Sequence, residues 1–201
     1  MLEKRYSFVS VDLQNEFASE GGKFYTSKPS IGFLKEVLFP YLRRRGIKIN
    51  EIISDYRQPR PGDRGDGCHP GEWGYESLMP EDLRQSLWIK CMNSPIWVRE
   101  NIGNTDREPG LPYPDPESFT KWLTKNVGNP ETVIPVLIGL TADCCVLSTS
   151  QELNWRGFYP IVLKEGVDHA SGKLEDRDRV LDSPVSNWAR VINWSEIKEK
   201  L

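Results

Sequence analysis

The chain has 201 residues, with 26 Lys and Arg against 29 Asp and Glu, a formal net charge of −3 at pH 7 and both charge signs interspersed. This pattern offers neither the basic stripe of a nucleic-acid-binding protein nor a polybasic membrane anchor, and no window approaches the roughly 20 apolar residues of a membrane span. Because residues 1–6 lack the apolar core of a signal peptide and four cysteines do not resemble a disulfide framework, we expect a cytoplasmic protein with reduced thiols that binds neither nucleic acid nor membrane.

Apolar runs predict six strands that alternate with helical segments. The first strand covers residues 6–11, and a helix over 31–42 follows it and ends at Gly46. The other strands are predicted at 49–53, 87–90, 133–138, 159–163 and 189–192. A helix ending at Gly157 follows the fourth strand, and another covers 174–181. This order predicts a single domain, 1–201, with a three-layer α/β/α, doubly wound, Rossmann-like fold and a mostly parallel six-stranded sheet.

Two prolines disturb this pattern. Pro40 interrupts the apolar face of the first helix, which predicts a kink or a late helix start. Pro135 has no N–H to donate within a central strand, so we expect regular pairing of that strand to begin only at Val136.

Chemically complementary residues lie at three predicted strand ends. Asp12 follows the first strand, Lys90 ends the third, and Cys144 and Cys145 lie where the fourth strand turns into a helix. Open α/β sheets bind ligands at the carboxyl ends of their strands, and a thiol in the first turn of a helix is favoured as a thiolate. The alternative is structural: solvated charges at strand ends and cysteines that pack a helix against the sheet.

Four segments resemble the motifs of a known family, the isochorismatase-like cysteine hydrolases, which include nicotinamidases and N-carbamoylsarcosine amidase. Residues 12–17 match Asp-x-Gln-x-x-Phe, and Lys90 is followed by a Ser-x-x-aromatic segment at 94–97. Residues 70–76 resemble Pro-Gly-Thr-x-Gly-Ala-Glu, and residues 139–149 resemble Gly-x-x-Thr-Asp-x-Cys-Val-x-x-Thr. In order and spacing, the resemblance extends from about residue 5 to about residue 194.

The resemblance implies a catalytic triad of Asp12, Lys90 and Cys145, because Cys144 falls at the variable position before the family's nucleophile. In such a site Cys145 attacks the carbonyl carbon of an amide or carbamoyl C–N bond and forms a thioester that water hydrolyses. Asp12 takes the thiol proton and later returns it to the leaving group, and Lys90 stabilises the thiolate.

An oxyanion hole is implied at the same turn. The backbone N–H groups of Thr141 and Cys145 would form it, beside a non-proline cis peptide bond between Leu140 and Thr141. The family's Thr-Asp pair before the cysteine reads Ala142-Asp143 here, with Thr141 one position early.

The chain departs from the family at the metal-binding positions. The family's Asp-x-His segment reads Asp55-Tyr56-Arg57, its second histidine position falls on Gly67, and His69 lies two places further along. With two histidines in the whole chain, a His-rich site cannot be assembled, so we expect no catalytic metal and no cofactor. Asp55 is then expected to be a hydrogen-bonding residue at a strand end.

Aromatic residues lie close to three motif positions: Phe17, Trp73 and Trp97. They predict an aromatic substrate-binding pocket for a flat or apolar small molecule, and the alternative is that the tryptophans belong to the core. The proline-rich loop over 101–116 is longer than most connections, so we expect it to contact substrate or a neighbouring subunit.

The sequence therefore predicts a metal-free cysteine hydrolase of small-molecule C–N bonds. One alternative is a vinyl-ether hydrolase of the isochorismatase type, which would use Asp12 without the cysteine. Another is a non-catalytic relative that serves as a binding or oligomerisation module. The resemblance also implies a homodimer or homotetramer. The identity of the substrate is not encoded in any motif.

Overall fold

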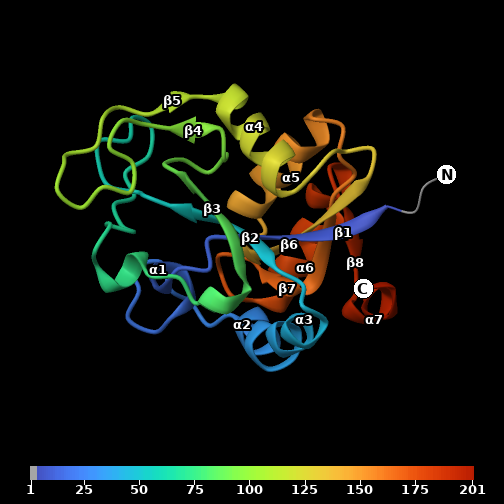
Figure 1. The fold of residues 1–201 in the computed structure, drawn as a ribbon. Coiled ribbons are helices and arrows are strands. Elements are labelled where there is room, and N and C mark those ends of the chain that lie inside the picture. The colour runs from blue at the N-terminus through green and yellow to red at the C-terminus, as the bar shows by residue number, and fades with distance from the viewer. Residues whose placement is uncertain (1–3) are drawn as a thin grey trace.

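The computed structural model describes residues 4–201, and a six-stranded sheet forms its centre (Figure 1). The strand order is β3-β2-β1-β6-β7-β8, and every neighbouring pair is parallel. The strands are β1 (Arg5–Val11), β2 (Ile49–Ser54), β3 (Arg84–Lys90), β6 (Val133–Leu140), β7 (Ile161–Asp168) and β8 (Arg190–Ile192). The predicted α/β fold with a parallel six-stranded sheet is confirmed.

Helices cover both faces of this sheet. Figure 1 shows α4 and α5 on one side and α2 and α3 on the other. The α-helices are α1 (Asn15–Ala18), α2 (Pro29–Phe33), α3 (Phe39–Arg45), α4 (Pro116–Asn126), α5 (Cys145–Trp155), α6 (Leu174–Asp182) and α7 (Trp194–Ile197). Short 3-10 turns occur at η2 (Trp73–Tyr75), η3 (Glu81–Leu83), η4 (Val185–Asn187) and η5 (Lys198–Lys200). Helix α7 packs on α3 through the rings of Trp194 and Tyr41, whose centroids lie 5.0 Å apart.

The strand order reverses between β1 and β6. Successive strands add on one side of β1 as far as β3, and the chain then crosses back to add β6, β7 and β8 on the other side. In doubly wound sheets the ligand crevice lies at the carboxyl ends of the strands where the order reverses. The fold therefore places a binding site after β1 and β6.

The two strands at this reversal approach each other closely at Gly139. Gly139 pairs with Val11 and has a φ of 114°. A Cβ atom there would lie 2.0 Å from the carbonyl oxygen of Val11. Only glycine permits both the backbone conformation and the close contact.

The expectations for Pro40 and Pro135 have different outcomes. The helical segment after β1 is interrupted as expected, because a π-helical turn, η1 (Leu34–Leu38), separates α2 from α3, and Pro40 is in the first turn of α3. The expectation that pairing begins at Val136 was wrong for one neighbour. β6 pairs with β1 from Val133, whereas its pairing with β7 begins at Val136. Pro135 thus lies where β6 has a single neighbour, and no bond to β7 is lost there.

The segment between β3 and β6 is more ordered than the sequence indicated. Within the predicted loop over 101–116, β5 (Tyr113–Pro114) pairs antiparallel with β4 (Trp97–Val98). Helix α4 follows and was not predicted. Its start signals are present, because the side chain of Asp115 accepts a hydrogen bond from the backbone N–H of Ser118 and Pro116 is the first helical residue.

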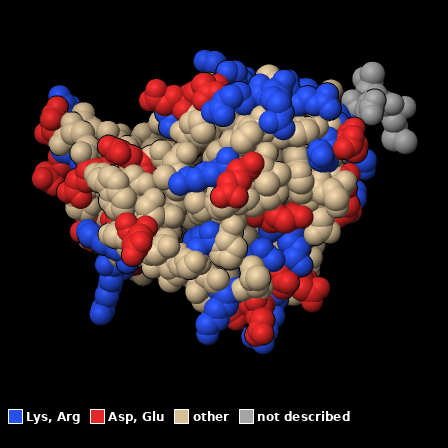
Figure 2. Space-filling model, turned by 90° about the horizontal axis from the view of Figure 1, so that it is seen from below, with Lys and Arg blue, Asp and Glu red and all other residues tan. Residues whose placement is uncertain are grey.

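Acidic and basic side chains are both found across the face in Figure 2. None of the helices within residues 4–201 has the length and hydropathy that a membrane-spanning helix requires.

Candidate active site

The carboxyl ends of β1, β3 and β6 bring the three predicted catalytic residues together. Asp12 directly follows β1, Lys90 is the last residue of β3, and Cys145 begins α5 after β6. All three side chains are buried. Residues far apart in the sequence thus form one cluster at the point where the strand order reverses.

The side-chain nitrogen of Lys90 is at the centre of the cluster. Nζ donates to Asp12 Oδ2 at 2.9 Å, to Ser54 Oγ at 2.8 Å and to Tyr56 Oη at 2.8 Å. Ser54 Oγ in turn donates to Asp12 Oδ1 at 2.9 Å. Burial lowers the pKa of Lys90, but the Asp12 carboxylate and the other neighbours outweigh it and hold that pKa well above its ordinary value. Lys90 is therefore an ammonium group.

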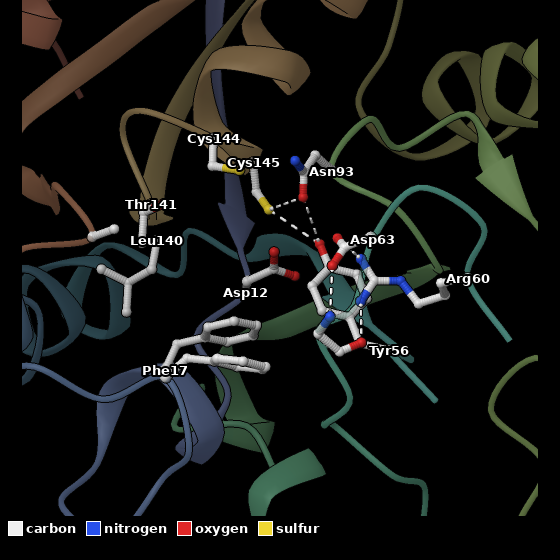
Figure 3. A pocket seen from close by; sticks show the side chains of 13 residues that line it. Asp12, Phe17, Tyr56, Arg60, Asp63, Asn93, Leu140, Thr141, Cys144 and Cys145 are labelled. Carbon is white, nitrogen blue, oxygen red and sulfur yellow. Dashed lines mark hydrogen bonds and ion pairs between the residues drawn. The ribbon is translucent and has the colours of Figure 1, made fainter. Parts of the chain in front are cut away.

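The sulfur of Cys145 faces Tyr56 and Asn93 (Figure 3). Sγ lies 3.2 Å from Tyr56 Oη, 3.4 Å from Lys90 Nζ and 3.8 Å from Asn93 Oδ1. Among the hydrogen bonds of the described residues, none joins Asp12 to Cys145. Lys90 therefore lies between the carboxylate and the sulfur and contacts both.

The two adjacent thiols differ in their acidity. The contact with Cys144 and burial raise the pKa of Cys145 well above its ordinary value, while the Lys90 ammonium acts in the opposite direction. The same contact lowers the pKa of Cys144. Cys145 is thus a neutral thiol at rest, and its sulfur must lose a proton in order to act as a nucleophile.

The turn between β6 and α5 leaves two backbone donors free. The peptide bond between Leu140 and Thr141 is cis, as predicted. The Thr141 carbonyl accepts hydrogen bonds from the N–H groups of Cys144 and Val146 at 3.1 and 3.0 Å. Within residues 4–201, no hydrogen bond is donated by the N–H of Thr141 or of Cys145. Both residues line a cavity beside this turn, so these donors are available to a ligand.

A cavity of about 170 Å³ opens onto Cys145. Phe17 and Phe24 form an apolar wall, with their rings stacked at a centroid distance of 5.4 Å. The Arg60 and Asp63 ion pair lines another part of the cavity, as Figure 3 shows. Phe17 thus lies in the pocket where the sequence placed it.

The predicted pocket needs a correction at Trp73 and Trp97, because neither side chain lines the cavity. Trp73 lies in η2 and is 49% exposed, with its ring beside Gly21. Trp97 lies in β4, where its carbonyl accepts a hydrogen bond from the N–H of Cys91 at 2.9 Å. Closeness to a motif along the chain did not determine where either ring lies. The loop over 101–116 does not line the cavity either.

The residues at the position where the sequence resemblance would place a metal do not fit a metal ion. Asp55 is fully buried after β2, and its carboxylate accepts hydrogen bonds from Arg57 at 2.7 Å, from Arg99 at 2.9 Å and from the N–H of Gly103 at 2.9 Å. A cation would have to displace two guanidinium groups from this carboxylate. In the part of the chain that the structure describes, no group of three or more His, Cys, Asp or Glu is arranged to hold a metal.

Three polar residues of the cluster were not predicted from the sequence: Ser54, Tyr56 and Asn93. Ser54 ends β2 and Tyr56 follows two residues later, so the rule that identified Asp12 and Lys90 could have drawn attention to them. Asn93 lies in the loop after β3, and only the folded chain shows that its side chain faces the sulfur.

No protein-family model matches the sequence, and no curated protein matches it either. Solved structures match the fold over almost the whole chain. An isochorismatase-like hydrolase from Alkaliphilus metalliredigens has a TM-score of 0.68 at 19% identity and covers 98% of both chains. The pyrazinamidase of Pyrococcus horikoshii, in complex with zinc, has a TM-score of 0.66 at 17% identity and covers 94% of this chain and 99% of its own.

A third similar structure is the N-carbamoylsarcosine amidase of Thermoplasma acidophilum. It has a TM-score of 0.61 at 20% identity, with 94% of this chain and 96% of the other covered. The chain therefore has the fold of the isochorismatase-like hydrolases. Within that fold, it places an aspartate, a lysine and a cysteine together at the strand ends beside a cavity.

Proposed function

We propose that this protein is a metal-free cysteine hydrolase that cleaves an amide or carbamoyl C–N bond of a small molecule through a thioester. The observation that carries the proposal is the position of Lys90 Nζ, 3.4 Å from Cys145 Sγ and 2.9 Å from the Asp12 carboxylate, beside a cavity. A nucleophile, a cation and a carboxylate in contact are the groups that acyl transfer requires. Similar folds belong to nicotinamidases, a pyrazinamidase and an N-carbamoylsarcosine amidase.

In the proposed reaction, Cys145 Sγ forms a bond to the carbonyl carbon as its proton leaves. Lys90 contacts both the sulfur and Asp12, so it can give one proton to the carboxylate as it takes one from the thiol. Asp12 then protonates the leaving nitrogen as the C–N bond breaks. Water attacks the resulting thioester, and the thiol is restored.

The free N–H groups of Thr141 and Cys145 are the proposed donors to the oxyanion of each tetrahedral intermediate. They are fixed in the turn from β6 to α5 and carry no other hydrogen bond within residues 4–201. Loss of one such donor typically lowers the rate by about 10²–10³-fold.

The cavity favours a small neutral substrate. An apolar cavity of about 150 Å³ can hold one benzene ring, so the volume of about 170 Å³ suits a single-ring amide or a compound of similar size. Arg60, which lines the cavity, is paired with Asp63, and Lys90 beside Cys145 is paired with Asp12. A substrate carboxylate would have to compete with these pairs.

The first test compares ammonia release from neutral amides, such as nicotinamide and pyrazinamide, with release from the anionic N-carbamoylsarcosine. We expect the neutral amides to be preferred, and Cys145→Ala to lower the rate by about 10⁴-fold or more because it removes the nucleophile. Cys91→Ala is the matched control, since Cys91 is buried outside the cavity. Full activity of Cys145→Ala would contradict the thioester. Absence of ammonia release by the wild type would instead direct attention to a vinyl-ether substrate or a non-catalytic role.

Dialysis against a metal chelator tests the metal-free part of the proposal. We expect the same hydrolysis rate before and after dialysis, because the Asp55 carboxylate is held by Arg57 and Arg99. A rate that falls with the chelator and returns with a divalent cation would contradict it. The cytoplasmic location and the homodimer or homotetramer stay predictions from the sequence.

A further inference from the structure

The hydrogen bonds of Lys90 determine whether the Tyr56 hydroxyl donates to it or accepts from it. An ammonium group has three N–H donors. Three oxygen atoms lie at 2.8 to 2.9 Å from Nζ, whereas the sulfur of Cys145 lies at 3.4 Å. The three N–H groups are therefore directed at Asp12, Ser54 and Tyr56, and Tyr56 Oη is an acceptor toward Lys90.

The phenolic proton of Tyr56 then has two acceptors within reach. Cys145 Sγ lies 3.2 Å from Oη, and Asn93 Oδ1 lies 3.4 Å from it. The hydroxyl can donate to Asn93 while the thiol is neutral, and it can donate to the sulfur when that becomes negative. Burial raises the pKa of Tyr56 well above its ordinary value, so the group keeps its proton.

The ring of Tyr56 is held on several sides. The Arg60 guanidinium lies 3.8 Å from the ring centroid, and the ring of Phe17 meets it edge-on at 6.0 Å. The backbone of Tyr56 pairs with Gly67 through two hydrogen bonds of 3.1 and 3.3 Å. The hydroxyl is thus fixed next to the sulfur before any substrate binds.

We propose that Tyr56 is a fourth catalytic residue, whose hydroxyl donates a hydrogen bond to Cys145 Sγ as the thiolate forms. The inference rests on the proposed function and deepens it. Tyr56 keeps its proton throughout, and the thiol proton still passes to Asp12. Because Tyr56 Oη accepts from the Lys90 ammonium, its O–H is polarised and stabilises negative charge on the sulfur, which develops only during attack.

The test is the pH dependence of alkylation of Cys145 by iodoacetamide, followed by peptide mass spectrometry that separates Cys145 from Cys144. The charged and titratable groups around the sulfur are Lys90, Asp12, Tyr56 and Cys144. Tyr56→Phe removes the hydroxyl alone. We expect its Cys145 to react about tenfold or more slowly at pH 8, with the alkylation profile shifted to higher pH, because a hydrogen bond to a charged group is lost.

Tyr41→Phe is the matched control. Tyr41 is also buried, and its hydroxyl donates to the Lys198 carbonyl at 2.7 Å, but it lies on α3 and does not line the cavity. Its alkylation profile is expected to equal that of the wild type. An unchanged profile in folded Tyr56→Phe would overturn the proposal, because a merely structural hydroxyl would not alter the acidity of the sulfur.

A second variant keeps the test valid if Tyr56→Phe does not fold. Site-specific 3-fluorotyrosine at position 56 preserves the ring and makes the hydroxyl a stronger donor, so the profile is expected to shift to lower pH; no shift would overturn the proposal. Alkylation needs no substrate, so this outcome is independent of the proposed hydrolase activity. Amide hydrolysis that requires Cys145 but is unaffected by Tyr56→Phe would contradict the role of Tyr56 alone.

Discussion

Asp55 has a structural role at a position where the sequence resemblance would place a metal ligand. Its buried carboxylate joins Arg57, Arg99 and the N–H of Gly103, the last from the loop over 101–116. Burial raises the pKa of Asp55, but the hydrogen bonds from Arg57 and Gly103 and the charge of Arg99 outweigh it, so the pKa lies below its ordinary value. The ionised carboxylate thus ties β2 to that loop.

The stability of the fold should depend on pH through this residue. An aspartate with a depressed folded pKa stabilises the native state above its unfolded pKa of about 3.9, and that contribution is lost as pH falls through the lower folded pKa. Asp55→Asn is expected to lower the free energy of unfolding by about 3–5 kcal/mol near neutral pH, because Arg99 stays buried without its partner. Urea unfolding of both proteins between pH 2 and 7 should show this difference shrinking below about pH 4.

Asp82→Asn is the control for that measurement. Asp82 pairs with Arg43 on the surface, and both side chains are about half exposed. Little change in stability is expected at any pH. A difference for Asp55→Asn that stays constant down to pH 2 would refute a role for its ionised form.

The sequence predicted some residues of the site and not others. Asp12, Lys90 and Cys145 could be predicted because each follows or ends an apolar strand and lies in a motif with defined spacing. The role proposed for Tyr56 could not be predicted from the Asp55-Tyr56-Arg57 segment, because it depends on where the hydroxyl points. The prediction that Trp73 and Trp97 line the pocket differs from the structure for the same reason. Position in the sequence does not specify where such a side chain points.

The site depends most on the contact between strands β1 and β6. Gly139 lies two residues before Thr141, and a Cβ there would meet the Val11 carbonyl, next to Asp12. A side chain would push apart the strands that carry the carboxylate and the nucleophile.

Gly139→Ala is therefore expected to reduce stability by at least about 2 kcal/mol and to lower the hydrolysis rate together with it. The strained φ and the backbone clash act at the same place. Gly32→Ala in α2 is the control, because a Cβ there meets nothing within 4 Å, and its stability should be equal or slightly higher. Denaturant unfolding and the rate, measured on the same samples, check both. Wild-type values for Gly139→Ala would contradict this account.

The elements themselves were predictable to different degrees. Strand β6 is a long apolar run buried on both faces, which is the pattern typical of a parallel strand. Strands β1 and β2 are also almost fully buried, although they contain polar residues among the apolar ones. Helix α4 was missed because its first residues lie in a proline-rich segment that indicates a loop. Proline at the first helical position is compatible with a helix, and the Asp115 cap shows that this is the case here.

For the whole molecule, the parallel sheet determines how the cluster is assembled. The groups around Lys90 Nζ come from the ends of β1, β2, β3 and β6, which are neighbours in the sheet but are spread along the chain from Asp12 to Cys145. No single helix or hairpin contains the site. Its geometry is a property of the folded sheet, which explains why the fold could be inferred more fully than the contacts of each side chain.

This arrangement has a consequence for folding kinetics. Contacts between distant segments form slowly, because the chain must close long loops before they contribute any stability. An intermediate that has paired β1, β2 and β3 would contain Asp12, Tyr56 and Lys90 but lack the sulfur, which arrives with β6. The proposed hydrolase activity is therefore expected to return during refolding only after β6 has docked beside β1.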